Sequence, residues 1–169
     1  PSESGRRRAT PELVRVVVGH LADRVLRRMR RAGLAGRTVT VRVRFVGMRS
    51  ITRSITVTEP VSATLTLREL AEGLVRQGLE EHPTEQEITL LAVAVSGLDH
   101  GHDLQLEFAT GQDDPHREAS PSGASRLAVD RSMDSVRTRF GRAAVGYGSV
   151  VLGERGLVPD EFRELAERD

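Results

Sequence analysis

The feature that most constrains this chain is the alternation of side chains between residues 38 and 57, TVTVRVRFVGMRSITRSITV. In the first run every second residue is apolar, and the residues between are Thr or Arg. A period of two is typical of a β-strand with one buried face. A second run follows a connection through Gly47; its polar positions are Ser or Thr, and Arg53 stands among its apolar positions. The two runs predict paired strands with an open face rich in Arg, Ser and Thr.

Charge is distributed unevenly along the chain. The net charge is only +1, yet residues 1–57 hold 14 Arg and 3 acidic residues (net +11), whereas residues 58–169 hold 11 Arg and 21 acidic residues (net −10). A basic segment attracts polyanions because binding releases their counterions. Arg guanidinium groups beside short hydroxyls suit a phosphate backbone. The alternative is a solvated face whose Arg side chains pair with acids elsewhere in the fold.

Length and composition limit the chain to one modest core. It has 169 residues, of which 38% are hydrophobic and 3% aromatic, so Val, Leu and Ile must fill that core. The absence of Cys excludes disulfides and Cys-ligated metal sites and is compatible with a cytosolic protein. No apolar run approaches the roughly 20 residues that a membrane span needs, and the first residues do not resemble a signal peptide. We expect a cytoplasmic protein that makes no membrane contact.

Two amphipathic helices are predicted, one before and one after the strand pair in the sequence. Thr10 followed by Pro11 is typical of an N-cap and first turn, and the apolar stripe continues to about Arg31. Thr66 and Glu69 have the spacing of a capping box, which would open the second helix. We expect an α+β fold, in which two helices pack on one face of a small antiparallel sheet of three or four strands.

A further strand is predicted over residues 88–96, ITLLAVAVS. The run is mostly apolar and short enough for a central strand. One of its sides carries larger apolar residues, and the other carries small residues that would let a bulky ligand lie flat across the sheet. The large residues are Leu91, Val93 and Val95, and the small ones are Ala92, Ala94 and Ser96.

The rest of the chain divides by composition. Residues 1–9 are predicted to be a flexible basic leader, residues 10–108 the domain, residues 109–125 a linker rich in Pro, Ser, Gly and Asp, and residues 126–169 a helical tail too small for a core of its own. The helical stripe expected in the tail is Leu127, Val129, Met133, Val136 and Phe140, and a final short helix is expected over residues 159–168, with Phe162 and Leu165 as its apolar contacts.

The order of these segments resembles the little-finger domain of Y-family translesion DNA polymerases, of the bacterial DinB or polymerase IV type. The resemblance runs from about residue 11 to residue 152 and rests on the segments GRTVTVRVRF, ITRSITV and EITLLAVAVSGLD. The tail segment DSVRTRFGRAAVGYGSVVL is similar to the C-terminal extension of many DinB proteins from high-GC bacteria. The resemblance implies a β-α-β-β-α-β module. Its first strand is not recognisable in residues 1–10, and nothing in the chain resembles the palm, fingers or thumb.

The resemblance also implies a function. The sheet would lie along primer–template DNA and hold its phosphate backbone without reading bases, acting as a monomer on the nucleoid. No catalytic residue is expected, so this segment alone should not polymerise DNA. No cofactor or metal is expected either, because Mg²⁺ would belong to the catalytic part of the parent polymerase. The candidate DNA contacts are Arg42, Arg44, Thr52, Arg53, Ser54 and Thr56.

A short peptide after the sheet could serve the polymerase in a second way. The family docks on the replicative sliding clamp through a Gln-Leu pair followed by Leu and Phe, and Gln105, Leu106 and Phe108 stand at the corresponding place, one residue short of the usual pattern. Leu106 and Phe108 would enter an apolar pocket. An edge strand that finishes the domain would show the same alternation, so both interpretations stay open.

The remaining sequence patterns are weaker indications of a functional site. Asp99, His100, His102 and Asp103 could be drawn as a metal site, but a polar turn explains them, and no metal is assigned. An alternative function of another class is a protein-interaction adaptor or a catalytically inert Y-family relative, whose Arg-rich sheet meets an acidic partner. Salt-dependent DNA affinity would separate that alternative from the DNA-binding reading.

Overall fold

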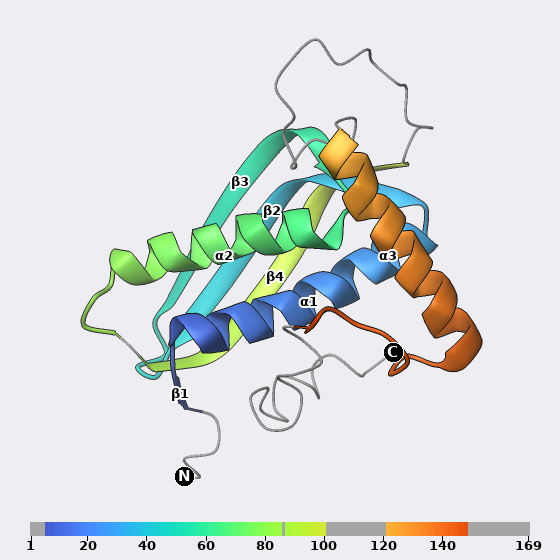
Figure 1. Ribbon diagram of the computed structural model, residues 1–169. Helices are drawn as coiled ribbons and strands as arrows, with labels where there is room; N and C mark the ends of the chain where they lie inside the picture. The colour runs from blue at the N-terminus through green and yellow to red at the C-terminus, as the bar shows by residue number, and fades with distance from the viewer. Residues whose placement is uncertain (1–5, 86, 101–120, 149–169) are drawn as a thin grey trace.

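The computed structural model describes residues 6–85, 87–100 and 121–148. Within these ranges, the four strands form one sheet in the order β1-β4-β2-β3, and every neighbouring pair is antiparallel. Helices α1 and α2 lie side by side on one face of this sheet, and α3 runs across their ends (Figure 1). The α+β fold predicted from the sequence is confirmed. The elements in chain order are β1 (Arg7–Arg8), α1 (Pro11–Arg31), β2 (Leu34–Phe45), β3 (Ser50–Val61), α2 (Thr64–Glu80), β4 (Glu87–His100) and α3 (Pro121–Phe140).

Strand β1 is the element that the sequence did not reveal. Arg7 lies opposite Ile88 and Arg8 opposite Glu87, inside the segment expected to be a flexible leader. Two residues are too few to show an alternation, so no period of two could have announced this strand. With β1 in place the sheet has four strands, and the first helix follows the first strand as the resemblance implies.

Helix α1 begins and ends where the sequence predicts. The backbone N–H of Leu13 donates to Oγ1 of Thr10 over 3.2 Å, which is the side-chain cap expected of Thr before Pro11. Past the helix, Gly33 has a φ of +65°, a left-handed conformation that glycine adopts without strain. The chain can therefore turn directly from α1 into β2 at Leu34.

The core lies between the sheet and the two helices. The alternation in β2 sends every second side chain toward the helices, and these side chains are at most 1% exposed. They are Val39, Val41, Val43 and Phe45, and they pack with buried residues of α1, α2 and β4 such as Val18, Leu26, Leu67, Val75 and Leu91. Burial of this apolar face fixes the register of β2, because a slip of one residue would bring the Arg and Thr side chains into the core.

Helix α2 starts differently from the prediction. It begins at Thr64, and its N-cap residue Ala63 makes no side-chain hydrogen bond. The capping box expected at Thr66 and Glu69 is therefore wrong: Thr66 lies inside the helix and is buried. A tertiary contact replaces the expected local cap: a carboxylate of α3 accepts a hydrogen bond from the first backbone N–H of α2.

Helix α3 also differs from the prediction in its start and in its buried side. It begins at Pro121, within the expected linker. Of the expected apolar stripe, Leu127 and Met133 are buried, whereas the other three residues are exposed. The buried side of α3 carries Asp130 and Arg137 instead. The helix expected over residues 159–168, with Phe162 and Leu165, lies outside the described residues.

Candidate nucleic-acid interface

The sheet face turned away from the helices is the candidate interface, and we call it the open face. Side chains directly opposite one another in an antiparallel pair lie on the same face, so the register defines the set. None of its members is acidic. It consists of Thr38, Thr40, Arg42 and Arg44 in β2, Ser50, Thr52, Ser54 and Thr56 in β3, and Leu90, Ala92, Ala94 and Ser96 in β4.

Arg42 lies at the middle of the open face. It is opposite Thr52 of β3 on one side and Ala92 of β4 on the other. Its side chain is exposed, and it forms neither a hydrogen bond nor an ion pair within the described ranges. A guanidinium group flanked by a hydroxyl and a methyl group can approach a flat anionic ligand without first breaking an internal contact.

Arg44 is more constrained than Arg42. It is half-buried, and its Nε donates to Oγ1 of Thr89 over 3.2 Å. The hydroxyl of Thr89 in turn donates to the backbone O of Arg44 over 3.3 Å. This contact holds the side chain at the edge where β2 meets the start of β4, and it leaves further guanidinium donors for a ligand because Arg has five N–H groups.

Arg53 leaves the candidate interface. It lies opposite Val41, so its side chain is on the helix side of the sheet. There its Nη2 donates to a carboxylate oxygen of Glu81, just after α2, and its Nη1 donates to the backbone O of Thr52 over 2.9 Å. The guanidinium lowers the pKa of Glu81, chiefly through this hydrogen bond. The residue already stood among the apolar positions of its strand, so the period of two was the better guide.

The open face also contains residues that were not selected as candidates. Thr40 lies opposite Ser54, and Ser50 lies opposite Arg44, so both flank the selected residues. Thr38 and Thr56 share a hydrogen bond between their hydroxyl groups at 2.9 Å. The same alternation that selected Arg42 could have selected Thr38, Thr40 and Ser50. Five of the six proposed DNA contacts therefore share one face with further Thr and Ser side chains.

The small residues predicted on one side of β4 are where the sequence placed them. Ala92, Ala94 and Ser96 are exposed on the open face, whereas Leu91 is buried toward the helices. A flat surface of this kind would admit a wide ligand across β2 and β4. Asp99 and His100 end β4 and are exposed. Within the described ranges, no group of three or more His, Cys, Asp or Glu side chains could hold a metal ion.

A second arginine-rich region lies on the helix side, where α3 packs on α1 and α2, and we call it the Arg30–Asp130 network. The Asp130 side chain is 0% exposed, and its Oδ2 accepts from the backbone N–H of Thr64 over 2.6 Å. Arg30 donates through Nη1 to the same oxygen over 3.3 Å and through Nε to Asp134 over 2.8 Å. The hydroxyl of Tyr147 donates to Oδ1 of Asp130 over 2.7 Å. Asp130 thus caps α2 from another helix.

Further ion pairs extend this docking along α3. Arg137 is 6% exposed in its side chain and lies 2.8 Å from Asp23 of α1. Arg126 pairs with Glu69 of α2 through two contacts of 2.8 and 3.0 Å.

Burial, followed by the hydrogen bond to Asp130, raises the pKa of Tyr147 well above its usual value. This network could not be predicted from the sequence, because its partners lie in segments far apart in the chain.

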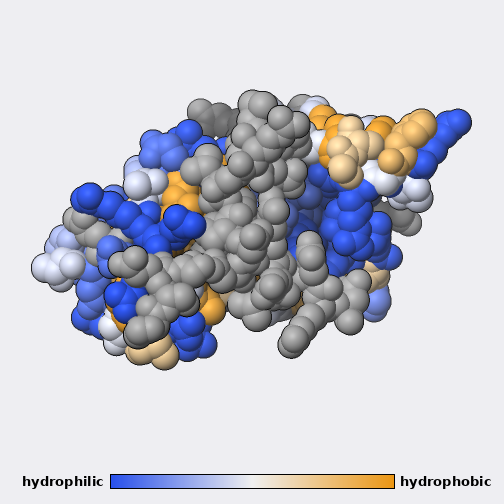
Figure 2. All heavy atoms as spheres, turned by 90° about the horizontal axis from the view of Figure 1, so that it is seen from below, coloured by the Kyte–Doolittle hydropathy of each residue, from blue (hydrophilic) through white to orange (hydrophobic). Residues whose placement is uncertain are grey.

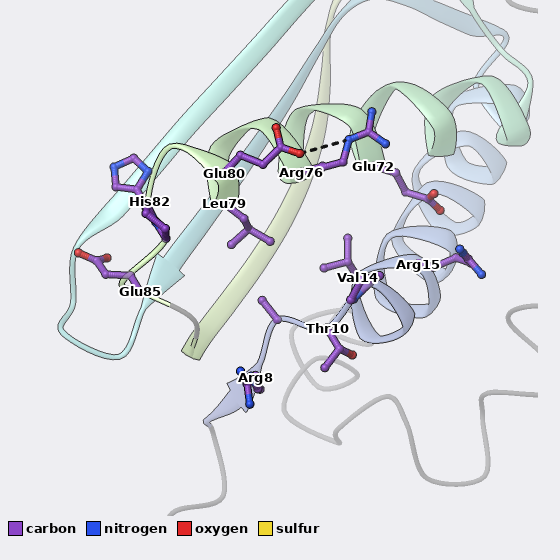
Figure 3. A pocket seen from close by; sticks show the side chains of 13 residues that line it. Arg8, Thr10, Val14, Arg15, Glu72, Arg76, Leu79, Glu80, His82 and Glu85 are labelled. Carbon is purple, nitrogen blue, oxygen red and sulfur yellow. Dashed lines mark ion pairs between the residues drawn. The ribbon is translucent and has the colours of Figure 1, made fainter.

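A cavity of about 520 Å³ lies between the start of α1 and the end of α2 (Figure 3). Its walls include apolar side chains such as Val14 and Leu79. Acidic side chains at its rim are engaged by neighbouring arginines, as in the pair of Arg76 and Glu80 at 4.0 Å. The cavity is on the helix side, so it does not extend the open face.

Comparison with known proteins identifies the domain. The family model described as the impB/mucB/samB family C-terminal domain matches residues 3–108. The chain belongs to this family. The match ends at the expected end of the sheet domain, and the domain is of the little-finger type found in Y-family polymerases of the DinB or polymerase IV type.

Curated relatives agree with this assignment. The chain is 50% identical over 163 residues to DNA polymerase IV 2 of Mesorhizobium japonicum, which covers 94% of this chain and 39% of that protein. It is 42% identical over 85 residues to DNA polymerase IV of Streptomyces coelicolor, covering 50% of this chain and 17% of that protein. The chain thus spans about two fifths or less of these relatives. An alignment over 94% of the chain necessarily includes α3, which lies beyond the family model.

No described helix is long and apolar enough to cross a membrane. The residues proposed for clamp docking, Gln105, Leu106 and Phe108, lie outside the described residues, as do His102 and Asp103.

Proposed function

We propose that this chain is the DNA-holding part of a DinB-like translesion polymerase, and that its open face rests on the phosphate backbone of primer–template DNA. The observation that carries this proposal is Arg42, exposed at the middle of a face that has hydroxyls along β3, mostly small side chains along β4 and no acid. Arg, Thr and Ser contacts to phosphates fix the position of a duplex without reading its sequence. A polymerase that copies damaged templates needs such sequence-neutral binding.

The two faces of the β2–β3 hairpin provide a matched experiment. Arg42→Ala and Arg44→Ala remove guanidinium groups from the open face, and Arg53→Ala removes one from the helix face of the same hairpin. We expect the double variant Arg42→Ala, Arg44→Ala to weaken duplex binding and to reduce the slope of log affinity against log salt by about 2. Arg53→Ala should leave the slope unchanged. Fluorescence anisotropy with labelled primer–template DNA over a salt series measures both quantities.

Sequence neutrality is the second part of the test. Two duplexes of unrelated sequence should lose the same affinity in the double variant, because backbone contacts carry no base information. An unchanged salt slope in the double variant would overturn the proposal and would favour an interaction module for an acidic protein. Equal losses in the double variant and in Arg53→Ala would point to a folding defect, which thermal unfolding of all three proteins detects.

We also propose that the peptide around Gln105 docks on the replicative sliding clamp. Its alternating apolar side chains suit an extended segment entering an apolar pocket. Replacement of both Leu106 and Phe108 by Ala should abolish binding to the purified clamp while duplex affinity stays unchanged. Clamp binding that survives this replacement would contradict the proposal.

The chemistry of nucleotidyl transfer is assigned to the rest of the parent polymerase, where carboxylates would hold Mg²⁺. This chain would contribute position, as a monomer that accompanies the polymerase on nucleoid DNA.

A further inference from the structure

Helix α3 presents an apolar stripe to solvent. Val129 is 51% exposed, Val136 is 38% exposed and Phe140 is 68% exposed. Spacings of seven and four residues place all three on one side of the helix, and we call them the α3 stripe. Figure 2 shows apolar atoms gathered at the upper right, on the side where α3 lies in Figure 1. Large apolar side chains grouped on a surface mark an interaction site.

The α3 stripe is not what holds α3 to the domain. The helix docks through an adjoining side, where Leu127 is buried and where Asp130 and Arg137 make the ion pairs to α1; Met133, four residues after Val129, is buried between that side and the stripe. Since those contacts fix the helix, the stripe is free to serve a different surface. Its exposure is then a feature of the docked helix rather than of an incompletely packed one.

The charges around the α3 stripe are of one sign. Both acidic residues of α3, Asp130 and Asp134, turn inward to Arg30. At the C-terminal end of the stripe, Arg139 and Arg142 are exposed, and the guanidinium of Arg139 lies 5.3 Å from the ring centroid of Phe140. This outer side of α3 is therefore apolar and cationic, which fits a surface that is apolar and acidic.

The position of α3 favours a protein rather than DNA as the partner. The helices lie on the face of the sheet opposite the open face, so a duplex on the open face would leave α3 uncovered (Figure 1). Nucleobases stack on aromatic side chains, whereas two of the three stripe residues are valines. Helix-in-groove complexes between proteins use aliphatic and aromatic anchors at this spacing.

We propose that the α3 stripe is a docking site for a second protein, whose surface offers an apolar groove with an acidic rim. Val129, Val136 and Phe140 enter the groove, and Arg139 and Arg142 face the acidic rim. The proposal is independent of DNA binding, because none of these residues belongs to the open face.

The first step of the test identifies the partner protein inside the cell. A photo-reactive phenylalanine analogue replaces Val136 in the full-length polymerase, irradiation is carried out in the native cells, and the cross-linked protein is identified and purified. Its affinity for the 169-residue chain is then measured by calorimetry. We expect Val136→Asp and Phe140→Asp to lower that affinity on the order of tenfold or more, as for anchors of an interface. Arg139→Glu should lower it as well, and an acid-to-Lys change in the partner's rim should restore it.

Ser135→Asp is the matched control, because it adds the same charge to the same helix at an exposed position off the stripe. It should change the affinity by less than about twofold. The unfolding midpoint and duplex affinity of Val136→Asp should equal those of the unchanged chain, which separates this proposal from the DNA proposal. Equal binding of the stripe variants and the control overturns it. So does a cross-link only to a second copy, to the polymerase's own catalytic part, or to no protein.

Discussion

The open face and the Arg30–Asp130 network both depend on arginine, and they use it in opposite ways. Arg42 is exposed and has no partner within the described ranges, whereas Arg30 contacts two carboxylates, and the Asp130 side chain beside it is 0% exposed. The first guanidinium can meet a ligand without first breaking a contact within the described part of the chain. The second already donates to Asp130 and Asp134 within the fold. The number of arginines in a segment therefore does not show how many of them are available to a ligand.

The difference follows from geometry. Arg42 stands on a strand whose alternate residues fill the core, so its own side chain must point to solvent. Arg30 stands on the last turn of α1, beside the start of α2, where two further elements converge. An arginine at such a junction meets carbonyl and carboxylate oxygens from several directions, and it acts in stability rather than in binding.

The largest effect is expected from breaking the network. Asp130→Ala leaves Arg30 with one carboxylate partner fewer and the first N–H of α2 without its cap. Removal of one partner of a buried ion pair costs about 3–5 kcal/mol, so the free energy of unfolding should fall by that amount. Urea unfolding followed by circular dichroism measures it.

Ser135→Ala is the control for this variant, since the residue is exposed on the same helix. It should change the free energy of unfolding by less than about 0.5 kcal/mol. If Asp130→Ala were as mild as Ser135→Ala, α3 would not stabilise the domain, and the contrast between the two arginine regions would lose its basis.

These two regions also differ in how far the sequence could predict them. The alternation of β2 and β3 identified the open face, and that of β3 put Arg53 among the apolar positions on the other face, because strand periodicity is a local property. The cap supplied by Asp130 could not be found in this way. It joins residues 64 and 130, and a helix pattern scored on apolar residues assigns a buried Asp to the solvent side. The same apolar scoring grouped Val129 and Phe140, which are exposed, with the buried Leu127 and Met133. Strand β1 was not predicted, because its two residues are too few to show a period.

A smaller effect sharpens the picture of the network. Tyr147→Phe removes the hydroxyl that donates to Oδ1 of Asp130 over 2.7 Å and leaves that oxygen without the hydrogen bond. The free energy of unfolding should fall by about 1–3 kcal/mol. Because the folded pKa of Tyr147 is raised, its stabilisation is complete below the ordinary pKa of 10.0 and is lost as pH rises through the folded pKa.

The chain contains one tyrosine, so tyrosinate absorbance reports Tyr147 alone. In the folded protein this absorbance should appear at higher pH than in the urea-unfolded chain. Coincident titration of the two states would show that the hydroxyl is neither buried nor bonded to Asp130.

On the open face, the expected effect on stability is close to zero. Arg42→Ala removes an exposed side chain that makes no hydrogen bond or ion pair with the described part of the chain. The free energy of unfolding should change by less than about 0.5 kcal/mol, while duplex affinity falls. Urea unfolding and anisotropy on the same preparation measure both. A destabilisation equal to that of Tyr147→Phe would mean that Arg42 is a structural residue.

The smallest effect is expected on the pKa of Glu81, the partner of Arg53. Arg53 is intermediate between Arg42, which has no partner in the described ranges, and Arg30, which contacts two carboxylates. Its hydrogen bond to the exposed Glu81 lowers the pKa of that carboxyl below the ordinary 4.5. A carboxyl whose folded pKa is lowered stabilises the fold above its unfolded pKa, and this contribution disappears as pH falls through the folded pKa. Arg53→Ala should return the pKa of Glu81 toward 4.5 in a carboxyl NMR titration, whereas Arg42→Ala should not move it. A pKa that responds to Arg42 instead would place Glu81 within reach of the open face, and the two faces of the hairpin would no longer be electrostatically separate.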